Sequence, residues 1–406
     1  MFFGAFTAEP RKTPHIIFDI GGTSVGGALV LLSPGERPFI VHGTRRWLRP
    51  LEEVSMERLA GLLETAVEAV AEDLLSLGKK RLAAAGWNGR FPRTPYCFVA
   101  APWYASQIDT VRIHHDHPFA VTHGMIERVL EKEKKAITAR VGGEGTHSPF
   151  VALENQILSF SVNGYETDAP YGQSGNDLEF SLYTALAEEK TLARFSGRIM
   201  RVMHADEIKT HSFLLAFFSA IRDSEGVAED FLLVDVSGEV TEISVVRNNR
   251  LTASVSYPLG RNFFARTLAR EAGVSFDEAF SFLAVHTKEE GNDALAARFR
   301  PALLQMESQW MKQFEESLTH IAGEAFLPHS VFVAADSVVS PWVKRGIQNE
   351  ELYQYTLAAK PFVVNVADAT ALAPRVVFGP GVEKDPFLMI DALFLEKIAH
   401  GEALER

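Results

Sequence analysis

The sequence predicts an α/β protein built from two related lobes, and three observations point to this class. The blocks at 15–49 and 231–260 share one plan: a β-strand that ends in aspartate, a turn of small residues, a returning strand, a second turn and a third strand. The two blocks lie about half a chain apart, and stretches with helical periodicity separate them. Internal repetition of this kind is typical of two similar lobes that face one another.

Composition limits the classes of protein that need to be considered. The chain has 406 residues, of which 47% are hydrophobic and 23% charged, as in ordinary globular proteins of more than one domain. The net charge of −12 argues against a nucleic-acid-coating role. The single cysteine, Cys97, excludes an internal disulfide and a cysteine-based metal site. No signal peptide and no long apolar run is recognisable, so a cytoplasmic location is expected.

The first half of the chain reads as strands followed by helices. Residues 1–14 lack periodicity and are expected to form a loose tail before the first block. The further elements expected are a helix over about 54–78, a strand near 95–101, an extended segment near 107–113, and a helix over about 122–139 with Thr122 as its N-cap.

The second half is expected to alternate in the same way. The expected elements are a loop at 141–150, strand-like segments over 151–180 with turns at Asn163-Gly164 and Tyr171-Gly172, a helix near 207–222, the repeated block, helices over 261–325, a strand at 330–335 and a last helix from Pro386 to about Ala399. The last helix is apolar on most faces, so we expect it to pack into the first lobe rather than onto a membrane.

The two repeated turns are candidate phosphate-binding loops. Asp19 and Asp235 each end an apolar strand just before the turn, and Thr23 and Ser24 add hydroxyl donors in the first turn. Backbone N–H groups of such a turn can approach an anion closely. Two opposed turns could hold a polyphosphate while the aspartates bind Mg²⁺ or its water ligands. The alternative is a pair of plain hairpin turns without a ligand.

Four further segments carry a family resemblance. The segments 97–136, 157–182, 210–223 and 256–269 follow one another as the corresponding segments do in the FtsA/PilM branch of the actin-like ATPase superfamily. The resemblance extends from about residue 15 to 399. It implies a bilobal actin-like fold with a small inserted α+β subdomain.

The resemblance also implies a division of the chain. The implied parts are a flexible tail (1–14), the first lobe (15–92), the inserted subdomain (93–176), the first lobe continued (177–226), the second lobe (227–345), the C-terminal part of the first lobe (346–399) and a tail (400–406). We expect the inserted subdomain to be a contact surface rather than part of the nucleotide cleft.

ATP and Mg²⁺ are the ligands that the resemblance implies, with Asp235 as the catalytic residue if the protein is active. Asp19 and Asp235 would bind Mg²⁺ through water. The implied nucleotide-binding residues are Asp19, Gly21, Gly22, Thr23 and Ser24 in the first loop, Ser237, Gly238 and Thr241 in the second loop, and Glu278, Ala335, Asp336 and Ser337 on the adenosine side.

The chain departs from the family pattern at the second loop and on the adenosine side. Ser237 and Glu239 replace glycines, and Ala335 and Asp336 fall in a segment where a run of glycines is usual. Without the glycines the backbone cannot approach a purine as closely. A carboxylate at Glu239 would face bound phosphate unless it turned out to solvent. We therefore expect weak ATP hydrolysis or none.

The observations favour one function and leave two alternatives open. The first is an FtsA-like adaptor of bacterial cell division at the inner face of the cytoplasmic membrane, which binds division-ring proteins and self-associates. The second is a PilM-like scaffold of type IV pilus assembly, which binds a short peptide of a membrane partner. The third is an active ATPase or a small-molecule kinase. None of them calls for nucleic acid, and contact with the membrane would be indirect.

A histidine-rich stretch offers a metal site as a further alternative. Residues 114–117 read His-His-Asp-His, but alternation along a strand would place them on opposite faces, and no second ligand cluster follows. A solvated polar stretch is the preferred interpretation.

Overall fold

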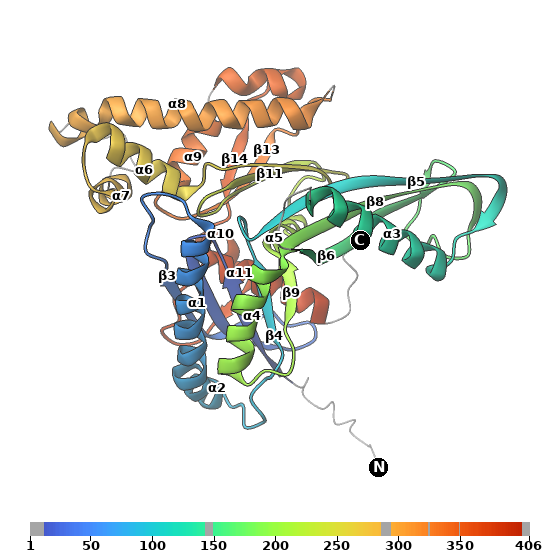
Figure 1. The fold of residues 1–406 in the computed structure, drawn as a ribbon, viewed down its shortest axis with the longest axis horizontal. Coiled ribbons are helices and arrows are strands. Elements are labelled where there is room, and N and C mark those ends of the chain that lie inside the picture. Colours follow the sequence, from blue (N-terminus) through green and yellow to red (C-terminus); the bar gives the residue numbers. More distant parts are fainter. Residues whose placement is uncertain (1–11, 143–148, 286–293, 324, 349, 400–406) are drawn as a thin grey trace, which may run out of the picture.

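The computed structural model describes residues 12–142, 149–285, 294–323, 325–348 and 350–399, and within these ranges the strands form three sheets. Figure 1 shows two lobes, one above the other, and a third sheet that extends to one side. The expected α/β class with two related lobes and an inserted α+β unit is confirmed.

The first-lobe sheet has a central antiparallel hairpin flanked by parallel strands. Its strand order is β15 (Val377–Phe378), β3 (Phe39–Trp47), β2 (Ser24–Leu32), β1 (Thr13–Ile20), β4 (Pro95–Val99) and β9 (Lys209–Ser212). Every residue of β2 is buried, as expected for a continuous apolar strand covered on both faces. Because β1 begins at Thr13, the expected tail is shorter than 1–14; residues 1–11 lie outside the described residues.

The second-lobe sheet repeats this plan. Its strand order is β12 (Arg250–Tyr257), β11 (Thr241–Arg247), β10 (Phe231–Val236), β13 (Ser330–Ala335) and β14 (Val363–Val366). The hairpin β10–β11 is antiparallel and β10–β13 is parallel, just as β1–β2 is antiparallel and β1–β4 is parallel. The predicted repeat of the two hairpin blocks is therefore confirmed.

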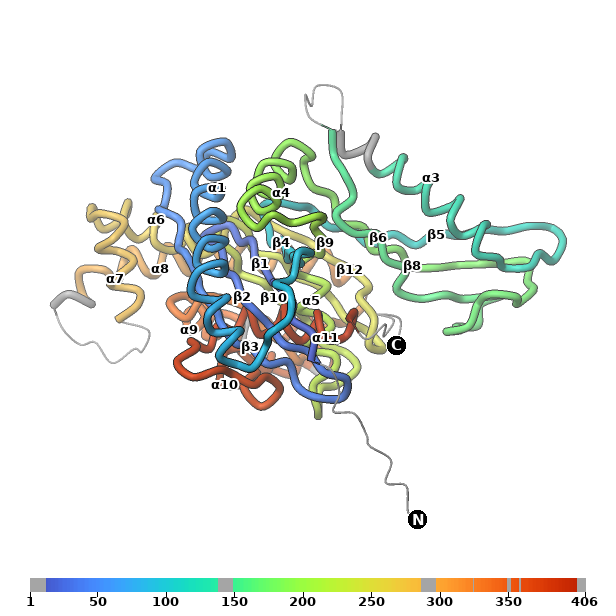
Figure 2. Tube along the Cα trace, turned by 90° about the horizontal axis from the view of Figure 1, so that it is seen from below, coloured from blue at the N-terminus to red at the C-terminus, as the bar shows by residue number. Residues whose placement is uncertain are grey.

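The third sheet is antiparallel throughout. One end of this sheet lies beside the two lobes, and the other end extends away from them (Figure 2). Its strand order is β5 (Tyr104–Ala120), β8 (Ser174–Glu188), β6 (Phe150–Val162) and β7 (Tyr165–Glu166). Helix α3 (His123–Gly142) covers one face, and the Thr122 hydroxyl accepts a hydrogen bond from Met125 N at 3.3 Å, in line with the predicted N-cap.

Helices cover both faces of the first-lobe sheet. The helices are α1 (Met56–Asp73), which continues through a π-helical turn (Leu74–Gly78) into α2 (Lys79–Ala84), then α4 (Glu189–Met203), α5 (Phe213–Arg222), α10 (Ala369–Leu372) and α11 (Pro386–Ala399). On β2, Gly27 faces Val70 of α1 while Gly26 faces Leu388 of α11, so these two helices lie on opposite faces. The core of α11 is fully buried, which confirms its predicted packing into the first lobe.

In the second lobe the helices gather on the outer side of the sheet (Figure 1). They are α6 (Arg261–Ala272), α7 (Phe276–Val285), α8 (Ala294–Ala322) and α9 (Ser340–Ile347), with short 3₁₀ turns at Glu350–Tyr355, Leu357–Ala359 and Ala373–Arg375 further along the chain. Trp310 and Phe314 of α8 are buried in the core of this lobe. No helix in the described ranges is both long enough and apolar enough to cross a bilayer.

Several expected boundaries differ from the structure. Strand β4 lies within the expected insert 93–176 but is a central strand of the first-lobe sheet, and β8 crosses the expected boundary at 176. Strand β14, expected in the first lobe, pairs with β13 of the second lobe. The helix expected over 207–222 begins as strand β9 and becomes helical only at Phe213.

Candidate functional site

The two predicted phosphate loops face one another across the cleft between the lobes. Each is closed by the same backbone hydrogen bond, from Gly21 N to Ser24 O at 3.0 Å in the first loop and from Ser237 N to Val240 O at 3.0 Å in the second. This matched geometry follows from the matched hairpins β1–β2 and β10–β11. The loops therefore come together as the sequence predicts.

The loops approach so closely that they touch. A Cβ atom added to Gly238 would lie 2.6 Å from the carbonyl carbon of Gly22 and 2.6 Å from Cγ2 of Thr23. A Cβ atom on Gly22 would lie 2.9 Å from Pro102 Cδ and 3.4 Å from Gly238 Cα. Only glycine fits at such contacts. In this arrangement the two turns are in direct contact at Gly22 and Gly238.

Asp19 is buried beneath the first loop and is paired with an arginine. Arg45 Nη2 lies 2.7 Å from Asp19 Oδ2, while Arg45 Nε lies 2.5 Å from Asp385 Oδ2 and Nη1 donates to Ser24 Oγ at 2.8 Å. Gly26 makes room for this guanidinium, since a Cβ atom there would lie 2.7 Å from Arg45 Nη2. Burial raises the pKa of Asp19, and Arg45 opposes that rise. The charge of Asp19 is thus compensated by a fixed cation of the same lobe.

Asp235 is buried at the equivalent position of the second loop. It lies opposite Glu242 in the β10–β11 register. Burial raises the pKa of Asp235 well above its ordinary value of 3.8, and the nearby carboxyls of Glu242 and Asp19 raise it further. Burial and two neighbouring carboxyls thus all disfavour the ionised form of Asp235, the form that a general base or a Mg²⁺ ligand requires.

Glu242 connects the second loop to the inserted sheet. Its carboxylate accepts hydrogen bonds from the Tyr104 hydroxyl at 2.9 Å, from Ser106 Oγ at 2.5 Å and from Ser254 Oγ at 3.1 Å. Burial raises its pKa, and these hydrogen bonds partly offset the rise. The Trp103 indole also donates to Gly21 O at 2.9 Å. Hydrogen bonds thus join the root of the inserted unit to both loops, and the expectation that the insert is a contact surface rather than part of the nucleotide cleft stays a prediction.

Ser237 and Thr241 make structural hydrogen bonds. Ser237 Oγ lies 2.9 Å from the carbonyl oxygens of both Ala101 and Val240. Thr241 is buried, and its hydroxyl donates to Leu259 O at 2.7 Å. Its side chain faces the second-lobe core rather than the cleft.

Glu239 takes neither of the two orientations that the sequence suggested. Its carboxylate is buried, accepts a hydrogen bond from Asn262 Nδ2 at 2.8 Å and forms an ion pair with Arg266, both on α6. It faces neither phosphate nor solvent. The second loop is further held by α6, because Arg261 N donates to Ser237 O at 2.8 Å and Asn262 N to Gly238 O at 3.0 Å.

The adenosine side of the cleft is occupied by Arg261. Its guanidinium lies 4.7 Å from the ring of Trp47 and 4.2 Å from that of Phe280, and its Nε lies 3.5 Å from Asp336 Oδ2. Burial lowers the pKa of Arg261, and Asp336 counteracts this. Trp47 belongs to the first lobe and Phe280 to the second, so Arg261 bridges the cleft.

The remaining predicted adenosine-side residues do not gather around one cavity. Glu278 is exposed and forms a capping box with Ser275 at the start of α7, where Glu278 N donates to Ser275 Oγ at 3.2 Å. Ala335 is buried at the end of β13, and Ser337 is exposed. Of these residues only Asp336 lines the cavity beside the loops.

That cavity combines predicted and unpredicted residues. Its lining consists of Asp19, Gly21, Gly22, Thr23, Ser24, Arg45, Trp47, Ala100, Phe213, Asp235, Val236, Ser237, Gly238, Arg261, Asp336 and Phe387. Sequence reasoning missed Arg45, Trp47 and Arg261, because none of them stands in a recognisable motif. Among the described residues no group of three acidic, histidine or cysteine side chains could hold a metal ion, and this includes the His114–His117 stretch.

A magnesium nucleotide does not fit the residues as they stand. The loops touch, Asp19 is paired with Arg45, burial raises the pKa of Asp235, and Arg261 fills the adenosine side. We therefore derive no phosphoryl-transfer step from this arrangement.

Comparison with known proteins identifies the fold. No family model and no curated protein matches the chain. The two hairpin-based lobes around a central cleft define the class as a bilobal actin-like α/β protein. The chain is similar to a solved structure described as a PilM-PilN type IV pilus biogenesis complex, with a TM-score of 0.56 and 15% identity over 97% of this chain and 99% of that chain.

Two weaker likenesses were also found. A glycerol dehydratase reactivase matches with a TM-score of 0.47 and 10% identity over 95% of this chain and 100% of that one. The ethanolamine utilization protein EutJ from Carboxydothermus hydrogenoformans matches with a TM-score of 0.42 and 12% identity over 95% of this chain and 90% of that one.

Proposed function

We propose that this protein is an actin-like scaffold that assembles with protein partners, and that it acts as a PilM-like scaffold in type IV pilus assembly. The observation that carries the proposal is the likeness in fold to the PilM-PilN complex along 97% of this chain and 99% of that one. This match extends over nearly the whole of both chains, which supports a correspondence of the lobes and the inserted sheet. The scaffold would work at the inner face of the cytoplasmic membrane and reach it through its partners.

The chemistry of the cleft supports a scaffold over an active ATPase or kinase. Phosphoryl transfer depends on positioned donors and on Mg²⁺. Here Asp19 is paired with Arg45, and burial raises the pKa of Asp235, which disfavours its ionised form. Weak hydrolysis or none is the expected behaviour.

An FtsA-like adaptor of cell division is the second candidate. The order of segments along the chain favours it, in particular the turns at Asn163-Gly164 and Gly172, which have the positive φ angles expected of N-G and P-x-G turns. Self-association would belong to this role.

Binding measurements with defined partners test the proposal. The purified chain is titrated with the cytoplasmic segment of a PilN-type protein and, separately, with division-ring proteins from the same genome. Saturable binding of the PilN-type segment, but not of a scrambled segment of equal charge, supports the pilus scaffold. Binding of division-ring proteins alone supports the second candidate. Steady Mg-ATP hydrolysis without any partner binding would contradict both.

A further inference from the structure

Contacts join the two lobes across the cleft in three places, at its floor, at its side and at its rim. At the floor, Gly22 touches Gly238, and Ser237 Oγ donates to Ala101 O at 2.9 Å. At the side, Arg266 Nη1 of α6 donates to Leu51 O at 3.4 Å, in the loop that leaves β3 and passes beside α6 in Figure 1. At the rim, Arg261 lies over Trp47.

Arg261 is the charged group among these contacts that lies deepest. Its side chain is nine-tenths buried, although it comes from the first turn of α6. A guanidinium between two aromatic rings is a favourable arrangement, because its flat face stacks while the ring electrons attract its charge. Its opposite charge comes from Asp336, on the same lobe. The contact that spans the cleft is therefore the one with Trp47.

We propose that the cleft is held closed by the protein's own side chains, with Arg261 as the pin between the lobes, and that closure needs no nucleotide. Arg45 completes the arrangement below the first loop, since it compensates Asp19 without a metal ion. The inference concerns the state of the cleft and does not depend on which partner the scaffold binds.

The consequence for ligands follows from mass action. A nucleotide that needs an open cleft binds only the open fraction of molecules, so its apparent affinity falls by that fraction. Loosening the pin should raise the open fraction and the apparent affinity together. The contact between Gly22 and Gly238 must also be lost on opening, so the two loops separate as one event.

Energy transfer between two labels measures the closure directly. Cysteines replace Leu77 on the first lobe and Leu304 on the second, which are 44% and 61% exposed. The native Cys97 is fully buried, which raises the pKa of its thiol and keeps it from labelling. Three labelled full-length proteins are compared: one with the native cleft, one with Arg261→Ala and one with Trp47→Ala. Each is measured without ligand, with EDTA and with Mg-ATP.

The native cleft should give one high transfer efficiency that none of these additions changes. Arg261→Ala and Trp47→Ala should both lower it, and since Trp47 is 52% exposed its replacement should not prevent folding. Arg270→Ala is the matched control, because Arg270 is exposed on the same helix and pairs with its neighbour Glu271. Low efficiency in the native protein that rises with Mg-ATP would overturn the inference. So would two pin variants that behave like Arg270→Ala.

Discussion

Glu239 and Arg266 show how a residue outside a motif can change what the motif does. A carboxylate in a phosphate loop repels phosphate, but here an ion pair with Arg266 of α6 directs the Glu239 carboxylate away from the cleft. We expect Arg266→Met to lower the free energy of unfolding by about 2–4 kcal/mol, because it leaves Glu239 buried without its cation. Urea unfolding measures this. The double variant with Glu239→Gln should recover most of the loss, whereas equal losses in both would show that the pair is not the cause.

Asp391 on α11 is a second buried acid with a predictable effect. Within the described part of the chain neither of its carboxyl oxygens has a hydrogen-bond partner, and it is fully buried. Burial raises its pKa well above the ordinary 3.8, and the carboxylate of Asp19 raises it further. The folded protein therefore keeps a proton that the unfolded chain releases, so this residue's contribution to stability falls as pH rises above about 4.

Replacing Asp391 by asparagine removes this titration. Between pH 4 and pH 7 the free energy of unfolding of Asp391→Asn should rise by about 1–3 kcal/mol relative to that of the native protein. The reason is that only the native residue releases a proton on unfolding as the pH rises. Urea unfolding at the two pH values gives the difference. A gain that does not depend on pH would mean that the carboxyl is ionised in the folded state.

The candidate site was predictable where its residues are local in sequence. Asp19, Gly22, Gly238 and Asp235 were found because each follows an apolar strand into a tight turn. Arg45 was not found, since its partner Asp385 lies 340 residues further along the chain. The register of β3 and the position of the distant helix α11 bring the two residues together, and the residues around Arg45 do not indicate either.

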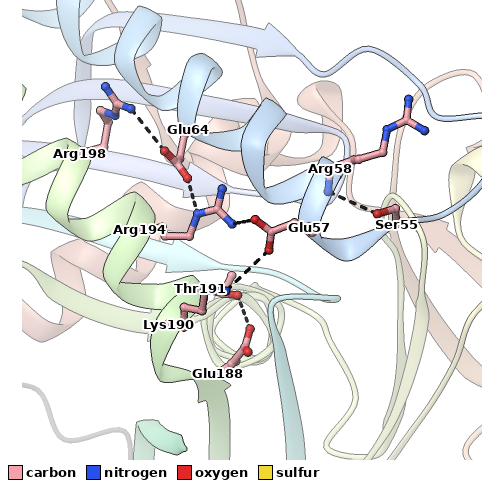
Figure 3. A network of polar contacts seen from close by, with 9 residues as sticks. All are labelled: Ser55, Glu57, Arg58, Glu64, Glu188, Lys190, Thr191, Arg194 and Arg198. Atoms are coloured by element: carbon pink, nitrogen blue, oxygen red, sulfur yellow. Dashed lines mark hydrogen bonds and ion pairs between the residues drawn. The ribbon is translucent and has the colours of Figure 1, made fainter. Parts of the chain in front are cut away.

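Helices α1 and α4 are joined by ion pairs that run along their shared side (Figure 3). Arg194 contacts Glu57 and Glu64, and Arg198 contacts Glu64 and Glu68. Burial raises the pKa of Glu64, but hydrogen bonds from the two arginines outweigh it, so the pKa is lowered. The stabilisation is present above the ordinary pKa of 4.5 and is lost as pH falls through the lowered value.

Glu64→Gln should therefore lower the free energy of unfolding by about 1 kcal/mol at low salt. In about 1 M salt, where the Debye length is about 3 Å, less than half of this loss should remain. Glu72→Gln is the control on the same helix, because Glu72 is exposed and has no ion pair in the described ranges. A loss at Glu64 that does not depend on salt would point to packing rather than charge.

At the scale of elements, the sequence predicted the hairpins correctly. It did not predict helix α4 or strand β14. The blocks β1–β3 and β10–β12 follow from apolar runs separated by turn residues. Helix α4 was missed although Phe195, Ile199 and Met203 recur at four-residue spacing and are buried. Strand β14 is only four residues long, and it becomes a strand because β13 offers it an edge.

For the whole molecule, the closed cleft predicts a weak thermal response to nucleotide. A ligand at about 100 times its Kd would stabilise the native state by about 2.7 kcal/mol and raise the Tm measurably. We expect no such rise with Mg-ATP at about 100 times a micromolar Kd. Differential scanning calorimetry with Mg-ATP and with Mg²⁺ alone makes the comparison. A rise specific to Mg-ATP would mean that the cleft opens readily and that the predicted loops bind phosphate after all.

Strand β5 begins against Glu242 in the cleft and pairs continuously with β8 as far as His114, where a bulge interrupts it near the far end of the inserted sheet. At about 3.3 Å per residue these 11 residues reach up to roughly 35 Å from the buried root of the strand. A lever of that length magnifies small rotations, so that a turn of about 5° at Tyr104 would move the tip by roughly 3 Å. A small rotation at the loops would thus displace the far end of the inserted sheet measurably, and a molecule bound there would respond to it.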